Sequence, residues 1–433
     1  MAQTAQFTVD GGNRAQRMDG FGVNINSKDW KDGKLKPVME LLIDDLGATI
    51  LRVDVFGKCD WIDEDGTLGK EKALSSENLE KVYSSEAAKD GWGLLRYLNE
   101  RGFEPYVTCT GVAPKWMMDG KILRDYDSFC EMIVSYVDWA KKKEGIRFSF
   151  LSPLNETDLG PPEGPYLEPK AYVDVCRNLD KALTNSGYSN DDIKLIVPEQ
   201  YTLYTEFLDA FSTAADLTDR IGLIGIHQYT EFTPEQFGDF LKKTADTYPN
   251  KPLWMTEYGD LDQTGEKEWQ VAWDSTARAL SFVKGGFQAG VVWDAFDNFH
   301  EHDDSWTIYG LIRVGNHART PKKRYYAAKH LYRFVKPGFV RLQTESAQND
   351  VELTAFMSPD GQDISLVGMN ASCDPRQLSF KLTGLPEVLS KGSGRLYTST
   401  ESENFTSQPD VILSNETVLI TVPPRSIFTL TTL

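Results

Sequence analysis

Two glutamates, Glu156 and Glu257, each follow directly on a short apolar run that has the pattern of a buried strand. A charged side chain at such a place is costly unless it has a task. Cleavage of a glycosidic bond needs two carboxyl groups: one protonates the leaving oxygen, and the other, ionised, attacks or stabilises the anomeric carbon. In retaining enzymes the two groups lie about 5–5.5 Å apart. We therefore predict that Glu156 and Glu257 form a catalytic pair, with Asn155 placed to bind the sugar 2-hydroxyl.

The elements that would position this pair alternate between strand and helix patterns. Short runs rich in Val, Ile and aromatic residues occupy 20–26, 49–55, 104–109, 148–154, 193–197, 221–226, 252–256 and 289–293. Helical spacing occurs at 37–46, 90–101, 127–143, 169–186, 203–214, 233–247, 266–285 and 325–334. Eight such units predict an α/β fold, a (β/α)8 TIM barrel. Glu156 and Glu257 would then end strands four and seven, which face each other across the barrel, at the carboxyl end where barrel enzymes place their catalytic groups.

The chain changes character after Pro337. Short alternating strands separated by Gly, Asn, Ser and Pro are expected at 351–356, 364–369, 377–382, 394–397, 417–422 and 426–430. This spacing is typical of an antiparallel β-sandwich. We predict a catalytic barrel over residues 15–336 and a C-terminal β-sandwich side domain over residues 337–433, which an N-terminal strand at residues 5–10 would join.

At the predicted strand ends, the sequence resembles the clan A glycoside hydrolases, which are retaining (β/α)8 enzymes. The residues that carry the resemblance are Asn155, Glu156 and Glu257 together with Arg52, His227, Tyr229 and Trp293. The resemblance implies that Arg52 orients the nucleophile, that Tyr229 hydrogen-bonds it, and that Trp293 forms the floor of the sugar site. We count these residues and His227 as the substrate-binding set around the carboxyl pair.

Within that clan, the chain looks most like glycoside hydrolase family 30. Three segments carry this resemblance, at residues 18–22, 325–338 and 422–430. The sequence departs from the pattern at Val23, where the family usually has a glycine, and at Thr157, where a proline commonly follows the catalytic acid. Families 5 and 39 are the alternatives. The resemblance implies β-glucosides, β-1,6-glucans, β-1,6-galactans, xylans or β-fucosides as substrates.

Other polar and aromatic residues fall in predicted strand-end loops. Candidates for stacking on sugar rings are Trp30, Trp61, Trp116, Tyr201 and Phe232, and candidates for binding sugar hydroxyls are Asn24 and Asn26. The run at residues 300–304 contains two histidines and three acids and looks like a metal cluster, but alternating residues splay apart, so we interpret it as a solvated acidic loop. We expect no metal and no cofactor.

Composition limits the partners. The formal net charge of −18 disfavours nucleic acid and anionic membranes, and is compatible with a neutral oligo- or polysaccharide substrate. We find neither an apolar run long enough for a membrane span nor a visible signal peptide. Sequons at Asn370, Asn404 and Asn415 favour a secreted or extracytoplasmic protein, and five cysteines without a CxxC pattern leave the disulfide content open.

Two alternatives to hydrolysis remain at this point. A transglycosylase would use the same catalytic pair with a sugar as the acceptor, and a non-catalytic carbohydrate-binding protein would keep the barrel without turnover. The side domain could also act as a sugar-binding module. The oligomeric state cannot be deduced from the sequence.

Overall fold

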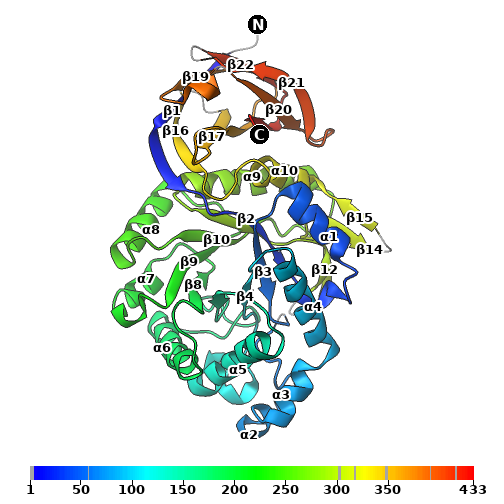
Figure 1. The fold of residues 1–433 in the computed structure, drawn as a ribbon, viewed down its shortest axis with the longest axis vertical. Coiled ribbons are helices and arrows are strands. Elements are labelled where there is room, and N and C mark those ends of the chain that lie inside the picture. The colour runs from blue at the N-terminus through cyan, green and yellow to red at the C-terminus, as the bar shows by residue number, and fades with distance from the viewer. Residues whose placement is uncertain are drawn as a thin grey trace.

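Eight parallel strands close into a barrel in the lower part of the molecule (Figure 1). The computed structural model describes residues 4–56, 58–300, 304–315, 318–346, 350–390, 392–414 and 417–433. Around the barrel the strands are β2 (Gly20–Ile25), β3 (Ile50–Asp54), β4 (Tyr106–Thr108), β7 (Phe150–Ser152), β8 (Lys194–Gln200), β9 (Ile221–Gln228), β10 (Leu253–Tyr258) and β11 (Ala289–Val292). Because β11 pairs with β2, the sheet has no free edge. The predicted (β/α)8 barrel is confirmed.

Helices cover the outside of the barrel. They are α1 (Lys36–Glu40) with its π-helical continuation η2 (Leu41–Leu46), α4 (Glu86–Glu100), α5 (Tyr126–Asp138) with its continuation η4 (Trp139–Lys143), α6 (Pro169–Asn185), α7 (Glu206–Phe211), α8 (Pro234–Thr247), α9 (Glu268–Lys284) and α10 (Lys323–Tyr332). Local sequence sets some of their starts: Pro169 and Pro234 begin α6 and α8, and Thr233 forms a capping box with Gln236.

The barrel strands are apolar on both faces because each face is buried. The inner face fills the barrel with a cluster that includes Ile50, Ile196 and Leu223. The outer face packs against the helices in the main core of the protein. This explains why the strands are near-continuous apolar runs in the sequence rather than alternating ones.

Several elements differ from the prediction: the three short hairpins in the barrel loops and the strands Val340–Ser346 and Thr406–Ile412 were not expected, and two further differences lie in the barrel. Helices α2 (Lys70–Ala73) and α3 (Ser76–Tyr83) occupy a polar stretch where no element was expected, and Ser75 caps the second of them. Strands β8 and β9 extend beyond their apolar runs to Gln200 and Gln228. These extensions are polar but buried, and their backbones keep pairing with the neighbouring strands. They carry part of the candidate site.

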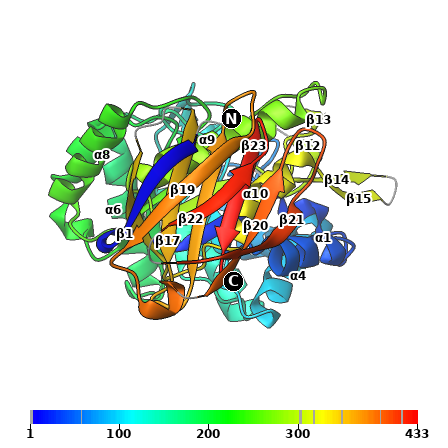
Figure 2. The same cartoon turned by 90° about the horizontal axis from the view of Figure 1, so that it is seen from above.

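Nine strands form a second sheet, called here the side sheet, at the top of Figure 1 and face-on in Figure 2. In spatial order these are β21 (Thr406–Ile412), β20 (Ser393–Ser399), β23 (Ser426–Thr431), β18 (Ile364–Asn370), β17 (Val351–Met357), β16 (Val340–Ser346), β1 (Thr4–Arg17), β19 (Arg376–Thr383) and β22 (Val418–Val422). All described pairs are antiparallel except β1 with β19. The edge strands β21 and β22 come close together, so the sheet folds over its own apolar core.

Helix α10 joins the barrel to the side sheet. His330 on this helix is fully buried, and its ring nitrogens lie 2.9 Å from the hydroxyls of Thr429 and Ser399. Just beyond the helix, the ring of Phe334 stacks on that of Tyr397 at 5.1 Å between centroids. Figure 1 shows α9 and α10 directly beneath the side sheet. The contact is therefore an apolar and hydrogen-bonded interface rather than a loose linker.

Three short hairpins lie in the loops of the barrel: β5 (Met118–Asp119) with β6 (Ile122–Leu123), β12 (Asn298–His300) with β13 (Ser305–Thr307), and β14 (Ile312–Gly315) with β15 (Ala318–Pro321). The five cysteines are all unpaired. Among the described helices, none combines the length and apolar character needed to cross a lipid bilayer.

Candidate active site

Glu257 lies on β10, and two side chains hold its carboxylate. Arg52 on β3 forms a short ion pair with Oε1, and the Tyr229 hydroxyl donates a hydrogen bond of 2.6 Å to Oε2. Arg52 is completely buried and also donates to the side-chain oxygens of Asn24 (2.6 Å) and Asn155 (2.8 Å). Because both oxygens of Glu257 accept charge-assisted or short hydrogen bonds, its orientation is fixed and its ionised form is favoured.

Glu156 follows β7 and faces the same space. Its Oε1 lies 2.5 Å from Nδ1 of His227, a histidine that is completely buried at the end of β9. The backbone of Glu156 has a φ of 40°, in the left-handed region that non-glycine residues rarely adopt. Such backbone conformations persist where surrounding contacts determine them, and they are concentrated at functional sites.

A third glutamate, Glu199 on the polar end of β8, completes the network and was not predicted. Its Oε2 lies 2.8 Å from Nε2 of His227 and 3.4 Å from Nη2 of Arg52, and its side chain is completely buried. Its backbone also has a positive φ, of 55°. Glycine at position 225 makes room for it, since a Cβ there would lie 2.9 Å from Glu199 Oε1. The signal was present in the sequence: Glu199, like Glu156 and Glu257, comes at the end of an apolar run.

The carboxyl groups of Glu156 and Glu257 meet in space. One oxygen of each, together with a nitrogen of His227, lies within 4.8 Å of the other two atoms. This separation fits the about 5–5.5 Å of retaining glycosidases rather than the roughly 6.5–9.5 Å of inverting ones. Glu156, His227 and Glu257 have the atom types that bind metal ions. Their candidate ligand atoms are already engaged, however, because Glu156 and His227 hydrogen-bond each other, and Arg52 and Tyr229 bond the two oxygens of Glu257.

The two carboxyl groups differ in their proton affinity. Burial raises the pKa of Glu156 to about 7, and the negative charge of Glu257 adds to this rise while His227 opposes it. Burial would also raise the pKa of Glu257, but the charges of His227 and Arg52 and the hydrogen bonds from Tyr229 and Arg52 outweigh it and lower that pKa. Near neutral pH the site thus offers one group that can hold a proton and one that is ionised.

Both carboxyl groups open into a cavity of about 380 Å³, called here the main cavity. Its lining residues are Asn26, Asp54, Thr110, Gly111, Asn155, Glu156, Leu159, Pro162, Glu163, Tyr201, Tyr229, Glu257, Leu261, Trp293, His300 and Tyr309. By the order of strands around the barrel, Asn26, Asp54 and the residues after strand eight come from one side, and the residues after strands four and five come from the opposite side. The volume lies within the usual range of small-molecule sites.

Comparison with known proteins identifies the family of this chain. The model of glycosyl hydrolase family 59 matches residues 70–330, more than half of the chain. The chain belongs to glycosyl hydrolase family 59. Its match to this family and its relatives make it a clan A glycoside hydrolase and a glycosidase. The family model therefore differs from the family 30 assignment expected from the sequence, while the clan expected from the sequence is confirmed.

The relatives of this family 59 chain are distant. It is 21% identical over 412 residues to "Putative glucosylceramidase 1" of Caenorhabditis elegans, covering 83% of this chain and 75% of that protein. It is 24% identical over 252 residues to the glucuronoxylanase XynC of Bacillus subtilis, covering 57% and 53%. The family 30 subfamily 8 xylanase Xyn30A from Clostridium acetobutylicum has the same fold, with a TM-score of 0.75, 17% identity, and coverage of 98% and 99%.

The structure divides the predicted site residues into groups. Asn155, Tyr201, Tyr229 and Trp293 line the main cavity with the two glutamates. Arg52, His227 and Asn24 do not line it: they are buried beneath the carboxyl groups, where they hold other side chains in place. We counted them in the substrate-binding set, but their polar atoms face protein partners; Arg52 pairs with Glu257, the contact that the resemblance to a nucleophile-orienting arginine implied.

Trp116 and several other aromatic candidates also lie outside the main cavity. The Trp116 indole nitrogen donates to Asp63 at 2.9 Å. Trp30 and Trp61 are buried, packed on Tyr97 and on the rings of Phe56 and Tyr136. Phe232 packs on the main core. None of these four aromatic side chains lines the main cavity, and sequence position alone does not distinguish loop aromatics from core aromatics.

The expected acidic loop is only partly described. Residues 301–303 lie outside the described residues. His300, which we expected to be solvated, is 5% exposed, lines the main cavity, and has its Nε2 3.2 Å from Asp294 Oδ2. Asn26, one of the weaker hydroxyl-binding candidates, also lines this cavity.

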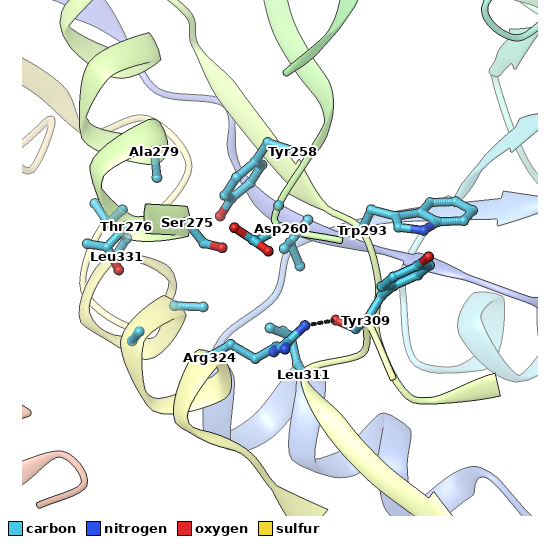
Figure 3. Close-up of a pocket in the computed structure, with 14 residues that line it drawn as sticks. Tyr258, Asp260, Ser275, Thr276, Ala279, Trp293, Tyr309, Leu311, Arg324 and Leu331 are labelled. Atoms are coloured by element: carbon cyan, nitrogen blue, oxygen red, sulfur yellow. Dashed lines mark hydrogen bonds between the residues drawn. The ribbon is translucent and has the colours of Figure 1, made fainter. Parts of the chain in front are cut away.

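A second cavity lies behind Trp293 (Figure 3). Trp293 and Tyr309 line both cavities and separate them. The second cavity has a volume of only about 10 Å³, room for about one water molecule. Arg324 lines this cavity next to Tyr309 and donates to the carbonyl oxygen of Tyr309 at 2.8 Å, shown as a dashed line in Figure 3. This space is too small for a sugar.

Proposed function

We propose that this glycosidase is a retaining β-glycoside hydrolase in which Glu257 is the nucleophile and Glu156 is the acid/base. The observation that carries the proposal is the close approach of the two carboxyl groups, one oxygen of each lying within 4.8 Å of the other, with pKa values shifted in opposite directions. Two titratable groups whose surroundings shift their pKa values in opposite directions suit separate roles as acid and nucleophile.

The first step forms a covalent glycosyl ester. Glu257 Oε attacks the anomeric carbon, the glycosidic C–O bond breaks, and the proton of Glu156 passes to the departing oxygen. Arg52 and Tyr229 hold Glu257 in the attacking orientation. In the second step Glu156, now ionised, removes a proton from water, and the water oxygen displaces Glu257 with net retention.

The substrate is proposed to be a glycan or glycoside with a neutral sugar at the cleavage point. Asp54, Glu156, Glu163 and Glu257 line the main cavity, and no lysine or arginine lies among its described lining residues. A uronic acid in this cavity would face several carboxyl groups without a basic partner. Neutral β-glucosides, xylans, and β-1,6-glucans or β-1,6-galactans, the substrate types implied by the family 30 resemblance, are the candidates.

A panel of defined β-linked oligosaccharides and aryl β-glycosides tests the proposal, with the anomeric configuration of the first product followed by NMR. We expect retention. Glu257→Ala should lose activity by orders of magnitude, and azide should restore turnover with formation of the α-glycosyl azide, since azide enters from the face that the nucleophile leaves.

Glu156→Gln provides the complementary test. It should lose about 10²–10⁴-fold on alkyl glycosides and far less on dinitrophenyl glycosides, whose leaving group needs no proton. An inverted first product, or either variant with wild-type activity on alkyl glycosides, contradicts the assignment. Sugar-containing products longer than the substrate would favour the transglycosylase alternative, which uses the same pair.

We also propose an extracytoplasmic location. The sequon residue Asn404 is exposed, which supports glycosylation there, whereas Asn370 is completely buried and bonded, and Asn415 lies outside the described residues. Expression in a eukaryotic secretion host, followed by enzymatic deglycosylation and mass spectrometry, should place a glycan at Asn404. Absence of any modification there removes this support.

A further inference from the structure

The main cavity contains a buried carboxyl group that neither the predicted site nor the proposed mechanism uses. Asp54 ends β3 and lines the main cavity, yet only 7% of its surface is exposed. Its Oδ1 is buried without a hydrogen-bond partner, and its side chain makes no hydrogen bond to the described part of the protein. A buried carboxyl group without partners is costly, and native proteins seldom keep one unless it has a partner in another state.

The register of the barrel explains where Asp54 points. Alternate residues of a strand face the same side, so Ile50, Arg52 and Asp54 of β3 project inward in successive layers. Ile50 lies in the apolar cluster inside the barrel, Arg52 lies beneath Glu257, and Asp54 comes one layer higher, at the cavity. On the neighbouring strand β2, Asn24 is paired with Arg52, which places Asn26 beside Asp54.

None of the charged groups that the structure describes around Asp54 forms an ion pair with it. Arg52 and His300 attract it, whereas Glu257 and Asp294 repel it, and burial is the largest influence, so its pKa rises to about 7. Arg52 is committed to Glu257, Glu199 and the two asparagines, and His300 to Asp294. The part of the chain that the structure describes thus places the Asp54 carboxyl group at the cavity without giving it a hydrogen-bond or ion-pair partner.

We propose that Asp54 binds hydroxyl groups of the sugar unit that becomes attached to Glu257, and so selects for that sugar. This inference rests on the proposed function. Glu156 protonates the leaving oxygen, so the leaving group lies toward the strand-four side of the cavity, and the retained sugar lies toward the side formed by Asn26, Asp54 and His300. The two oxygens of a carboxylate can accept hydrogen bonds from two neighbouring hydroxyls of a neutral sugar.

The proposal makes opposite predictions for stability and activity. Because the Asp54 side chain has no hydrogen-bond or ion-pair partner among the described residues, Asp54→Asn and Asp54→Ala should leave the melting temperature unchanged or raise it. The kcat/KM of Asp54→Ala for the best 4-nitrophenyl β-glycoside should fall roughly 10- to 100-fold, the range that a charge-assisted hydrogen bond contributes. A control, Asp45→Asn, removes a carboxylate that pairs with Lys329 on the outside of the barrel and should not change kcat/KM.

Monodeoxy analogues of that glycoside identify the contact. Wild-type enzyme and Asp54→Ala are compared on the parent glycoside and on each analogue. We expect the penalty of Asp54→Ala to shrink to less than about threefold on the analogue that lacks the bound hydroxyl, and to persist on the others.

An equal loss on every analogue would mean that Asp54 acts only through its charge, and it would overturn the assignment. A lower melting temperature of both Asp54 variants would overturn it as well, because the carboxyl group would then be structural. If wild-type enzyme hydrolyses none of the parent glycosides, the proposed function fails, and this inference fails with it.

Discussion

The hydrogen bond from Tyr229 to Glu257 offers a sharp test of the site. Tyr229→Phe removes one hydroxyl and keeps the ring, which stacks on Tyr201 at 6.2 Å between centroids. The lost bond is short, 2.6 Å, and its acceptor is a buried carboxylate. This hydrogen bond is one of the interactions that lower the pKa of Glu257. Its removal should therefore raise that pKa.

The size of the rise follows from the strength of the bond. A hydrogen bond to a charged group contributes about 1.5–3 kcal/mol. If most of this favours the ionised over the protonated carboxyl, the pKa of Glu257 should rise by about 1–2 units, since one unit corresponds to about 1.4 kcal/mol. Activity requires ionised Glu257, so the loss of activity toward acid pH should begin about 1–2 units higher in the variant.

The assay is kcat/KM as a function of pH with an aryl β-glycoside. In the wild-type enzyme the acid limb should lie below the usual range of a glutamate, and the alkaline limb near pH 7, where Glu156 loses its proton. Tyr258→Phe is a matched control, because the neighbouring Tyr258 hydroxyl bonds Tyr332 in the core and not a carboxylate. The control should leave both limbs in place.

An acid limb that stays in place in Tyr229→Phe, or that moves equally in Tyr258→Phe, would refute this reasoning. In the first case the hydroxyl would not stabilise the ionised nucleophile. In the second case the limb would report general destabilisation of the barrel at low pH rather than the titration of Glu257.

Three further predictions concern the supporting network and the interface with the side sheet. Burial would lower the pKa of His227, but the carboxylates of Glu257 and Glu156 and hydrogen bonds to Glu156 and Glu199 raise it to about 10. Glu199→Gln should therefore lower the pKa of His227, and NMR titration of the imidazole should show this change. Gly225→Ala should reduce kcat at unchanged net charge, because its Cβ would displace the Glu199 side chain; wild-type kcat would contradict the positioning role of that glutamate. Burial and nearby Lys329 lower the pKa of His330 to about 3, so between about pH 6.5 and 3 only the unfolded chain binds a proton at this histidine. The free energy of unfolding should therefore fall, as the pH drops through this range, by about 1.4 kcal/mol per pH unit from this group. Denaturant titrations of His330→Gln at several pH values should lack this contribution.

Much of the fold could be predicted because its strands are buried on both faces. Each of the eight barrel strands overlaps a continuous apolar run, and the fold rule then placed Glu156 and Glu257 at one end of the barrel. Local signals such as Pro169 at a helix start also had their expected meaning. The position of the main cavity could be predicted because it depends on strand order, which the alternation of elements determines.

The remaining features depend on contacts between distant residues. Glu199 was missed because its buried partners, Arg52 and His227, lie 147 and 28 positions away along the chain. The sequence correctly predicted that Arg52 and Asn24 lie near the site. It did not show that their polar groups face protein atoms, so we counted them among the residues that bind substrate. Whether a loop aromatic such as Trp116 lies at the main cavity depends on the conformation of its loop, which no periodic sequence pattern predicts.

The charges of the network also explain how one glutamate could serve as acid and then as base. Arg52 and protonated His227 place two positive charges beside the carboxyl groups of Glu156 and Glu257. In the proposed mechanism, ester formation removes the charge of Glu257, one of the influences that raise the pKa of Glu156. The ionised form of Glu156 then becomes easier to hold at the moment when the second step needs a base.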